Sequence, residues 1–272
     1  MNRIIKDKIV SFVGIIILSI VLFILFDIFI FIFLNGGSAI NLYMLTHTGD
    51  TTSGGILNAI VGTWELVGFA LLISIPVGLF SAIYISEYSS TKFGSFLKTV
   101  NDLITGIPSI VLGLFGFLFL VIYLNFGYSI LAGGITLGIT MIPYITRLTE
   151  MALSGIPDEM RINAYALGAN KFQTIRRILL RSAFPGFMAG IILAVSIGAG
   201  ETAQLLYTAG WNNYFPQSLT HSQVAYLTYV VWTGINQPST YSHNLAYVSA
   251  LILVLTILVL TVILRVVSRR VR

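Results

Sequence analysis

The chain has 272 residues, of which 56% are hydrophobic and only 9% are charged. This balance excludes a soluble globular domain and is typical of membrane proteins with several spans. The chain has no cysteine, which excludes disulfide bonds and thiolate metal sites, and its three histidines, His47, His221 and His243, are too scattered in sequence for a metal motif.

Six apolar stretches are long enough to cross a bilayer as helices, so the chain is predicted to be an all-α, polytopic integral membrane protein. They lie at residues 9–34, 59–85, 99–124, 129–153, 185–207 and 245–264. The first is too long for a signal-peptide core and lacks a convincing cleavage site, so we expect it to remain as a transmembrane helix.

Some spans are interrupted. Gly106 and Pro108 break the third span, whereas Pro76 and Pro143 lie inside the second and fourth. Packed neighbours allow such residues, because they satisfy the freed backbone groups. The middle of the last external segment, 224–233, is expected either to dip into the membrane or to lie on its surface.

The basic residues indicate the orientation of the chain. All fifteen fall in predicted internal loops, internal termini or cytoplasmic ends of spans; they include Arg3, Lys6 and Lys8 before the first span and Arg265, Arg269, Arg270 and Arg272 after the last. Positive residues concentrate on the cytoplasmic side of membrane proteins. We therefore predict a cell-membrane protein with both termini in the cytoplasm, and this topology explains the net charge of +5 better than a nucleic-acid partner does.

A short polar segment between the fourth and fifth spans is the most informative stretch. Pro157 suits the first turn of a helix, where its missing N–H is not needed, and Asp158 and Glu159 suit the positive end of the helix dipole. Gly168 can end this helix in a left-handed cap. A second short helix is predicted to begin near Asn170. This helix–glycine–helix elbow lies at the cytoplasmic membrane surface, either as a docking element or as an ordinary amphipathic loop on anionic lipid.

The elbow contains Ala-Leu-Gly-Ala at 166–169, about 30 residues before Gly-Glu-Thr-Ala at 200–203. In this combination the chain resembles the permeases of ABC importers, and more narrowly the A-type permease of phosphate-specific (Pst) importers. Supporting matches are Ser86-Glu87-Tyr88, Gly106-Ile107-Pro108-Ser109-Ile110 and Arg147-Leu148-Thr149-Glu150. Two departures are notable: Ile162-Asn163-Ala164 replaces the usual Glu-Ala-Ala, and an arginine common in phosphate permeases falls on Ile197.

The resemblance implies a type I ABC-importer permease fold with six transmembrane helices. Residues 59–272 would form the permease domain with its cytoplasmic coupling loop at 154–181, preceded by a helix and external loop at 1–58. The residues expected to couple the loop to an ATPase are Pro157, Asp158, Glu159, Arg161, Ala164, Ala166, Leu167, Gly168 and Ala169. The implied partners are a second homologous permease, two copies of an ATP-binding subunit and an external phosphate-binding protein.

The chain lacks the machinery of an enzyme. It contains no G-x-x-x-x-G-K-[S/T] phosphate-binding loop and no recognisable nucleophile or metal motif. We expect a non-catalytic transport subunit without a cofactor of its own, in which ATP–Mg is bound by the partner ATPase.

Polar residues inside the spans are candidates for the translocation pathway or its gate. An ionisable residue inside a span is costly and suggests a function, so Glu201 is the leading candidate, together with Ser196, Gly200 and Thr202. The alternative is a carboxylate that only locks helices together through a neighbouring Ser or Thr. Because a carboxylate repels an anion, we expect Glu201 to latch a gate rather than to bind phosphate.

Two further pairs each have two interpretations. Arg147 and Glu150 share one helical face, and Arg147 either attracts the anion or forms an intrahelical ion pair with Glu150. Pro108 and Ser109 belong either to a break whose backbone lines a cavity or to a packing kink. Asp102 is expected to cap a helix at the membrane interface.

The chain is thus expected to be the permease subunit of an ABC importer that moves inorganic phosphate into the cytoplasm by ATP-driven alternating access. Another oxyanion (sulfate, molybdate or tungstate) remains open, because Ile197 replaces the family's arginine. An ion-coupled secondary transporter is the alternative from a different class. That class usually shows inverted repeats, and none is found in the sequence.

Overall fold

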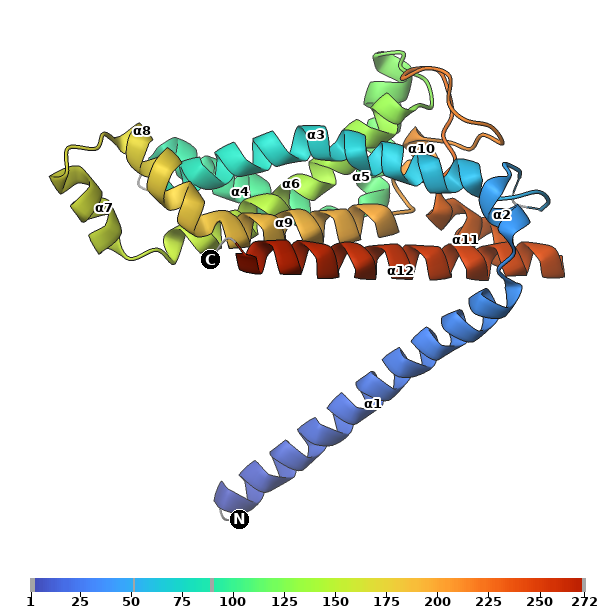
Figure 1. Ribbon diagram of the computed structural model, residues 1–272, viewed down its shortest axis with the longest axis horizontal. Helices are drawn as coiled ribbons and strands as arrows, with labels where there is room; N and C mark the ends of the chain where they lie inside the picture. Colours follow the sequence, from blue (N-terminus) through green and yellow to red (C-terminus); the bar gives the residue numbers. More distant parts are fainter. Residues whose placement is uncertain (1–2, 51, 89–90, 271–272) are drawn as a thin grey trace.

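The computed structural model describes residues 3–50, 52–88 and 91–270, which are almost entirely helical (Figure 1). The helices are α1 (Arg3–Ala39), α2 (Leu42–Thr46), α3 (Leu57–Glu87), α4 (Lys92–Gly106), α5 (Ser109–Gly116), α6 (Ile130–Ser154), α7 (Asp158–Ala166), α8 (Lys171–Thr174), α9 (Leu180–Gly200), α10 (Leu205–Thr208), α11 (Leu227–Ile235) and α12 (Thr240–Arg270). Two π-helical segments, η1 (Phe117–Tyr123) and η2 (Ile175–Leu179), continue α5 and α8. Residues 89 and 90, which lie between the second and third predicted spans, and the basic residue Arg272 lie outside the described residues.

The long helices α3, α6, α9 and α12 run side by side and form the body of the bundle (Figure 1). Lipid is as apolar as the helices, so their association depends on close packing rather than on the hydrophobic effect. Glycine permits this packing: a Cβ at Gly186 of α9 would clash with the Cβ of Ala152 on α6. Helix α6 contacts α3, α4 and α9, and it therefore lies at the centre of the bundle.

The six-span prediction agrees with these helices. Five helical stretches in the described residues are long and apolar enough to cross a membrane, and the pair α4 and α5–η1 makes a sixth if it is counted as one span. That pair bends by 102° between Gly106 and Ser109. The predicted interruption of the third span at Gly106 and Pro108 is therefore a sharp break between two helices.

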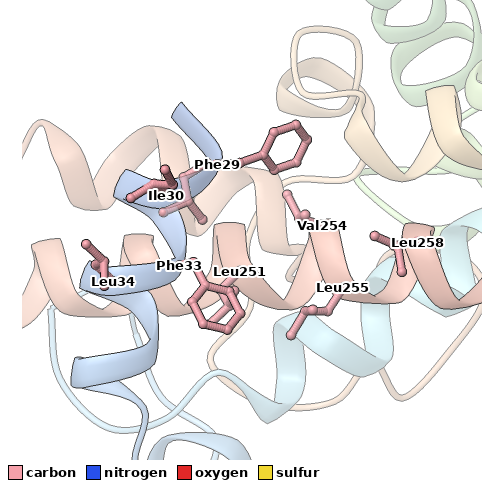
Figure 2. A pocket seen from close by; sticks show the side chains of 9 residues that line it. Phe29, Ile30, Phe33, Leu34, Leu251, Val254, Leu255 and Leu258 are labelled. Carbon is pink, nitrogen blue, oxygen red and sulfur yellow. The ribbon is translucent and has the colours of Figure 1, made fainter. Parts of the chain in front are cut away.

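Helix α1 leaves the bundle at an angle (Figure 1). Every side chain from Val10 to Phe31 is exposed, and α1 meets α12 where Gly36 packs against Tyr247 and Leu251. An apolar groove of about 500 Å³ lies between the two helices, lined by Phe33 of α1 and Leu255 of α12 among others (Figure 2). The acid Asp27 lies on the exposed part of α1, and the structure gives its carboxylate no hydrogen bond or ion pair with any described residue.

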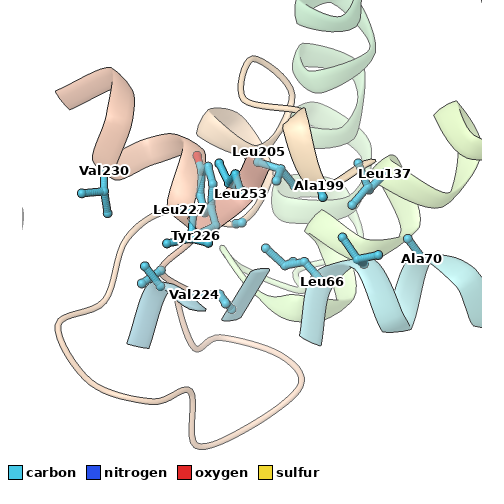
Figure 3. Packing of buried hydrophobic residues seen from close by; sticks show 14 of the residues in the cluster. Leu66, Ala70, Leu137, Ala199, Leu205, Val224, Tyr226, Leu227, Val230 and Leu253 are labelled. Carbon is cyan, nitrogen blue, oxygen red and sulfur yellow. The ribbon is translucent and has the colours of Figure 1, made fainter. Parts of the chain in front are cut away.

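One side of helix α11 packs into the bundle. Tyr226, Leu227 and Val230 are buried against side chains from α3, α6 and α12 (Figure 3). The backbone N–H of Leu227 donates to the Oγ1 of Thr63 on α3 at 2.9 Å, which fixes the start of α11. The first part of the segment is therefore anchored in the body of the protein, and its position relative to the membrane stays a prediction.

The fifth span differs most from its predicted bounds. Helical backbone is continuous from Lys171 to Gly200, so the second helix of the elbow is the first part of the span and not a separate helix. The span ends at Gly200 instead of residue 207, because Glu201 has an extended backbone with φ −74° and ψ 132°. Pro185, expected at the start of the span, lies inside α9.

Candidate functional site

The elbow between α6 and α9 begins and ends as the sequence indicated, with one shift. Pro157 is the residue before the first turn of α7 and not a member of it, since its ψ of 140° is extended. Asp158 and Glu159 occupy the first turn. Gly168 has φ +81°, and the N–H groups of Gly168 and Ala169 donate to the carbonyls of Tyr165 and Ala164. This pair of bonds is the Schellman motif, which confirms the predicted left-handed cap.

The second arm of the elbow starts with a capping box. The Asn170 side chain accepts from the N–H of Gln173 at 2.9 Å, and the Gln173 side chain accepts from the N–H of Asn170 at 3.0 Å. These two bonds satisfy N–H groups that the first turn of a helix leaves without partners. The direction of the chain after Gly168 is therefore fixed on both sides of the turn.

The tip of the elbow presents apolar side chains to solvent. Leu167 is 89% exposed, and Ile162, Tyr165 and Phe172 are also exposed. Ala164, a predicted coupling residue, faces the other way and is buried. Large apolar groups gathered on an otherwise polar element are typical of a surface that contacts another protein or a membrane.

Arg161, also a predicted coupling residue, points back toward the bundle. Its guanidinium pairs with the Glu87 carboxylate at the end of α3 (Nη2 to Oε1, 2.9 Å), and both side chains are largely buried. It also donates to the carbonyl oxygens of Leu153 and Ile156 at the end of α6. Arg161 therefore ties α7 to two transmembrane helices instead of standing on the surface.

A cavity of about 100 Å³ lies at the break between α4 and α5. It brings together two of the predicted pathway residues, Ser109 and Glu201, and it is also lined by Ile197. Sequence reasoning missed its other polar lining residues, Thr105, Thr140 and Tyr144. The spacing of Thr140, Tyr144 and Arg147 on α6 places them on one helical face, and this pattern could have identified them.

The remaining pathway candidates lie outside this lining. The Ser196 hydroxyl donates to the carbonyl of Ile192 on its own helix, and Gly200 and Pro108 are exposed. Thr202 is partly buried just after the bend at Glu201. The backbone carbonyl of Glu201 accepts from Thr228 Oγ1 at 2.8 Å, whereas its carboxylate makes no hydrogen bond or ion pair with a described residue, so the structure shows no Ser or Thr partner for a carboxylate lock.

Arg147 and Glu150 do not pair with each other. Arg147 pairs with Asp102 of α4 (3.3 Å), and Glu150 pairs with Lys98 of the same helix (3.6 Å). The intrahelical ion pair considered for the fourth span is therefore wrong, because α4 crosses α6 closely enough to offer opposite charges. Asp102 is likewise not a cap, since it lies inside α4.

A bundle of spans around a buried central helix, with a polar cavity at a helix break and an elbow that exposes apolar side chains at one end, is typical of the membrane subunit of a solute transporter. Comparison with known proteins specifies it further. Residues 74–272 match the family described as "Binding-protein-dependent transport system inner membrane component", and the chain belongs to this family.

The relatives agree with this assignment. The chain is 42% identical over 218 residues to "Phosphate transport system permease protein PstA 2" of Mycobacterium tuberculosis (strain CDC 1551 / Oshkosh), which covers 80% of this chain and 72% of the relative. It is 34% identical over 224 residues to "Phosphate transport system permease protein PstA" of Yersinia pestis, covering 82% and 75%. The resemblance to Pst permeases noted from the motifs is thereby confirmed.

Solved structures show the same fold. An inward-facing form of the MetNI methionine ABC transporter aligns with a TM-score of 0.61 at 18% identity, covering 80% of this chain and 97% of that one. The chain is thus a multi-pass membrane protein with an ABC-importer permease fold. As a member of its family it is a non-catalytic permease subunit that works with an ATPase and a substrate-binding protein, which excludes the ion-coupled secondary transporter.

Proposed function

We propose that this chain carries inorganic phosphate into the cytoplasm as one of two homologous permeases in an ABC importer. The observation that carries the proposal is the identity of 42% to a phosphate permease over 72% of that protein's length. Two copies of an ATPase would bind ATP–Mg, and an external phosphate-binding protein would deliver the anion. This chain would need no cofactor.

The elbow supports a mechanism for coupling. Its exposed tip, with Leu167 and Phe172, offers apolar groups that fit a groove on the ATPase, whereas its capped turn keeps the two arms in one geometry. Closure of the ATPase pair on ATP would move α7, and α8–α9 would follow as one continuous helix. The cavity would then open outward to accept the anion, and hydrolysis would reset it.

The cavity at the α4–α5 break supports a route for the anion. Ser109 and Tyr144 offer hydroxyl donors that a phosphate oxygen accepts, whereas the Thr140 hydroxyl donates to Gln204 Oε1 at 2.9 Å. No Lys or Arg is among the residues that line the cavity in the described part of the chain. The positive charge that an anion needs would therefore come from Arg147, seven residues after Thr140 on α6, or from the second permease. Glu201 would act as a gate latch, because its charge repels phosphate.

The placement of the chain ends supports a cytoplasmic location for both termini. The last turns of α12 lie toward the end of the bundle that carries α7, α1 runs away from the bundle toward the same side of the view, and α11 and the long loop before it lie at the opposite end (Figure 1). Because an ATPase docks on the cytoplasmic side, an elbow that couples to it would put this end of the bundle in the cytoplasm, which supports cytoplasmic termini.

Uptake of labelled phosphate tests the proposal. Cells that lack the gene receive the wild-type chain or Gly168→Pro, with unlabelled sulfate and molybdate as competitors. We expect wild type to restore phosphate uptake that the competitors leave unchanged, and Gly168→Pro to fail, because proline cannot adopt a positive φ. If losing the chain leaves phosphate uptake intact, phosphate is the wrong substrate, and the oxyanion panel is widened.

A further inference from the structure

Arg161 lies in the first turns of α7, yet it is turned away from the surface where an ATPase would dock. Its side chain is only 17% exposed, and that of its partner Glu87 is 6% exposed. On the same helix, Ile162 is exposed. Arg161 therefore contacts the transmembrane helices and not the surface where an ATPase would dock.

The guanidinium of Arg161 has five N–H donors, and the structure gives it five hydrogen bonds. Nε and Nη2 donate to Glu87 Oε1 at 3.3 and 2.9 Å. The other three bonds run from Nη2 to the Leu153 carbonyl (3.1 Å), and from Nη1 to the Ile156 carbonyl (2.9 Å) and to Asp158 Oδ1 (3.2 Å). One side chain thus joins the start of α7 to the ends of α3 and α6.

The second arm of the elbow holds the same point on α3. Lys171 Nζ donates to the backbone carbonyl of Glu87 at 3.0 Å, and its ammonium lies 3.5 Å from the centre of the Tyr88 ring. Glu87 is therefore bound from both arms, by its carboxylate and by its backbone. Cation–π contact with Tyr88 adds to this hold.

The connectivity of the chain makes this attachment significant. A short loop joins α7 to α6, and α8 continues into α9, so motion of the elbow reaches those two spans through covalent backbone. Helix α3 has no such connection, because about 70 residues separate Glu87 from α7. Only non-covalent contacts can transmit motion of α7 to the cytoplasmic end of α3.

We infer that the buried Arg161–Glu87 pair is the link through which movement of the elbow is passed to α3, so that Arg161 is a positioning residue for ATP-driven transport. This inference rests on the proposed function, because it assumes that the elbow couples to an ATPase. Two N–H groups of one planar guanidinium converge on a single oxygen of the largely buried Glu87 carboxylate, and such charge-assisted hydrogen bonds are strong enough to hold the two helices together.

The test uses the complete transporter in proteoliposomes, with Arg161→Gln, Glu87→Gln and the double variant. Arg161→Lys keeps the positive charge but not the planar guanidinium. Arg176→Gln is the matched control, because Arg176 is an exposed arginine on the same elbow. We expect both single Gln variants to assemble and hydrolyse ATP while uptake falls, so that ATP consumed per phosphate moved rises about tenfold, within the usual range of coupling between sites. The double variant should be no worse than either single one, because both remove the same link.

A second readout does not depend on the substrate. Because the chain has no cysteine, nitroxides can be attached at Leu72 of α3 and Leu258 of α12, both exposed. We expect ATP–vanadate to change the distance between them in wild type, Arg176→Gln and, more weakly, Arg161→Lys, but not in Arg161→Gln.

Two results overturn the inference: an unchanged ATP-to-phosphate ratio in assembled Gln variants, or a distance that responds alike in all variants or in none. If the wild-type complex moves no phosphate, the proposed substrate fails, but the distance measurement still decides whether the link exists.

Discussion

Gly168 shows how one residue sets the geometry of the elbow. Its φ of +81° lies in the left-handed region, where an L side chain with a Cβ is strained, and no atom lies within 4 Å of the place a Cβ would occupy. Any effect of a small substitution there must come from the backbone and not from a clash. The residue therefore offers a clean test of whether the turn itself is important.

Gly168→Ala is expected to cost roughly 1 kcal/mol of stability, because alanine pays the left-handed penalty that glycine avoids. Gly168→Asn is the matched control, since it adds a larger side chain but tolerates this region. Thermal unfolding of the purified protein in detergent would give the stability difference, and phosphate uptake would give the functional one. Equal behaviour of the two variants would contradict a role for the positive φ.

At the scale of elements, α4 and α6 are joined by two ion pairs where they cross. The Arg147 and Asp102 side chains are 56% and 55% exposed. Water and salt screen such a pair strongly, so it adds little to stability. Loss of Arg147 is therefore expected to affect anion transport more than the stability of the fold.

Exchanging the charges between α4 and α6 distinguishes a role of Arg147 in the ion pair from a role in anion transport. We expect Arg147→Gln and Asp102→Asn each to change the free energy of unfolding by no more than about 0.5 kcal/mol, whereas only Arg147→Gln strongly lowers phosphate uptake. The swap Arg147→Asp with Asp102→Arg keeps a pair but moves the positive charge to α4. Full recovery of uptake in the swap would mean that the ion pair, and not the position of the arginine, is what transport requires.

For the whole molecule, the sequence predicted the number of spans, their approximate bounds, the break at Gly106 and the cap at Gly168, because these depend on local composition and on glycine and proline. It missed features that depend on packing between distant segments. Arg161 was expected at a docking surface, and nothing local to α7 reveals that Glu87 lies beside it. The pairing of Arg147 with Asp102 was missed for the same reason: a preference for partners three residues apart on one helix was outweighed by a neighbouring helix.

The orientation of the molecule is the remaining prediction, and the absence of native cysteine makes it direct to measure. Single cysteines at Leu167 on the elbow and at Tyr214 in the long loop before α11 both replace exposed side chains; Asn2 and Arg272 provide sites near the two chain ends. If basic residues and the elbow face the cytoplasm, a membrane-impermeant maleimide added to intact cells should label only Tyr214→Cys. Permeabilised cells, as the control, should show labelling at all four positions.

Labelling of Asn2→Cys but not Arg272→Cys in intact cells would mean that α1 does not cross the membrane as predicted. Labelling of Leu167→Cys in intact cells would place the elbow on the outside, where no ATPase could reach it.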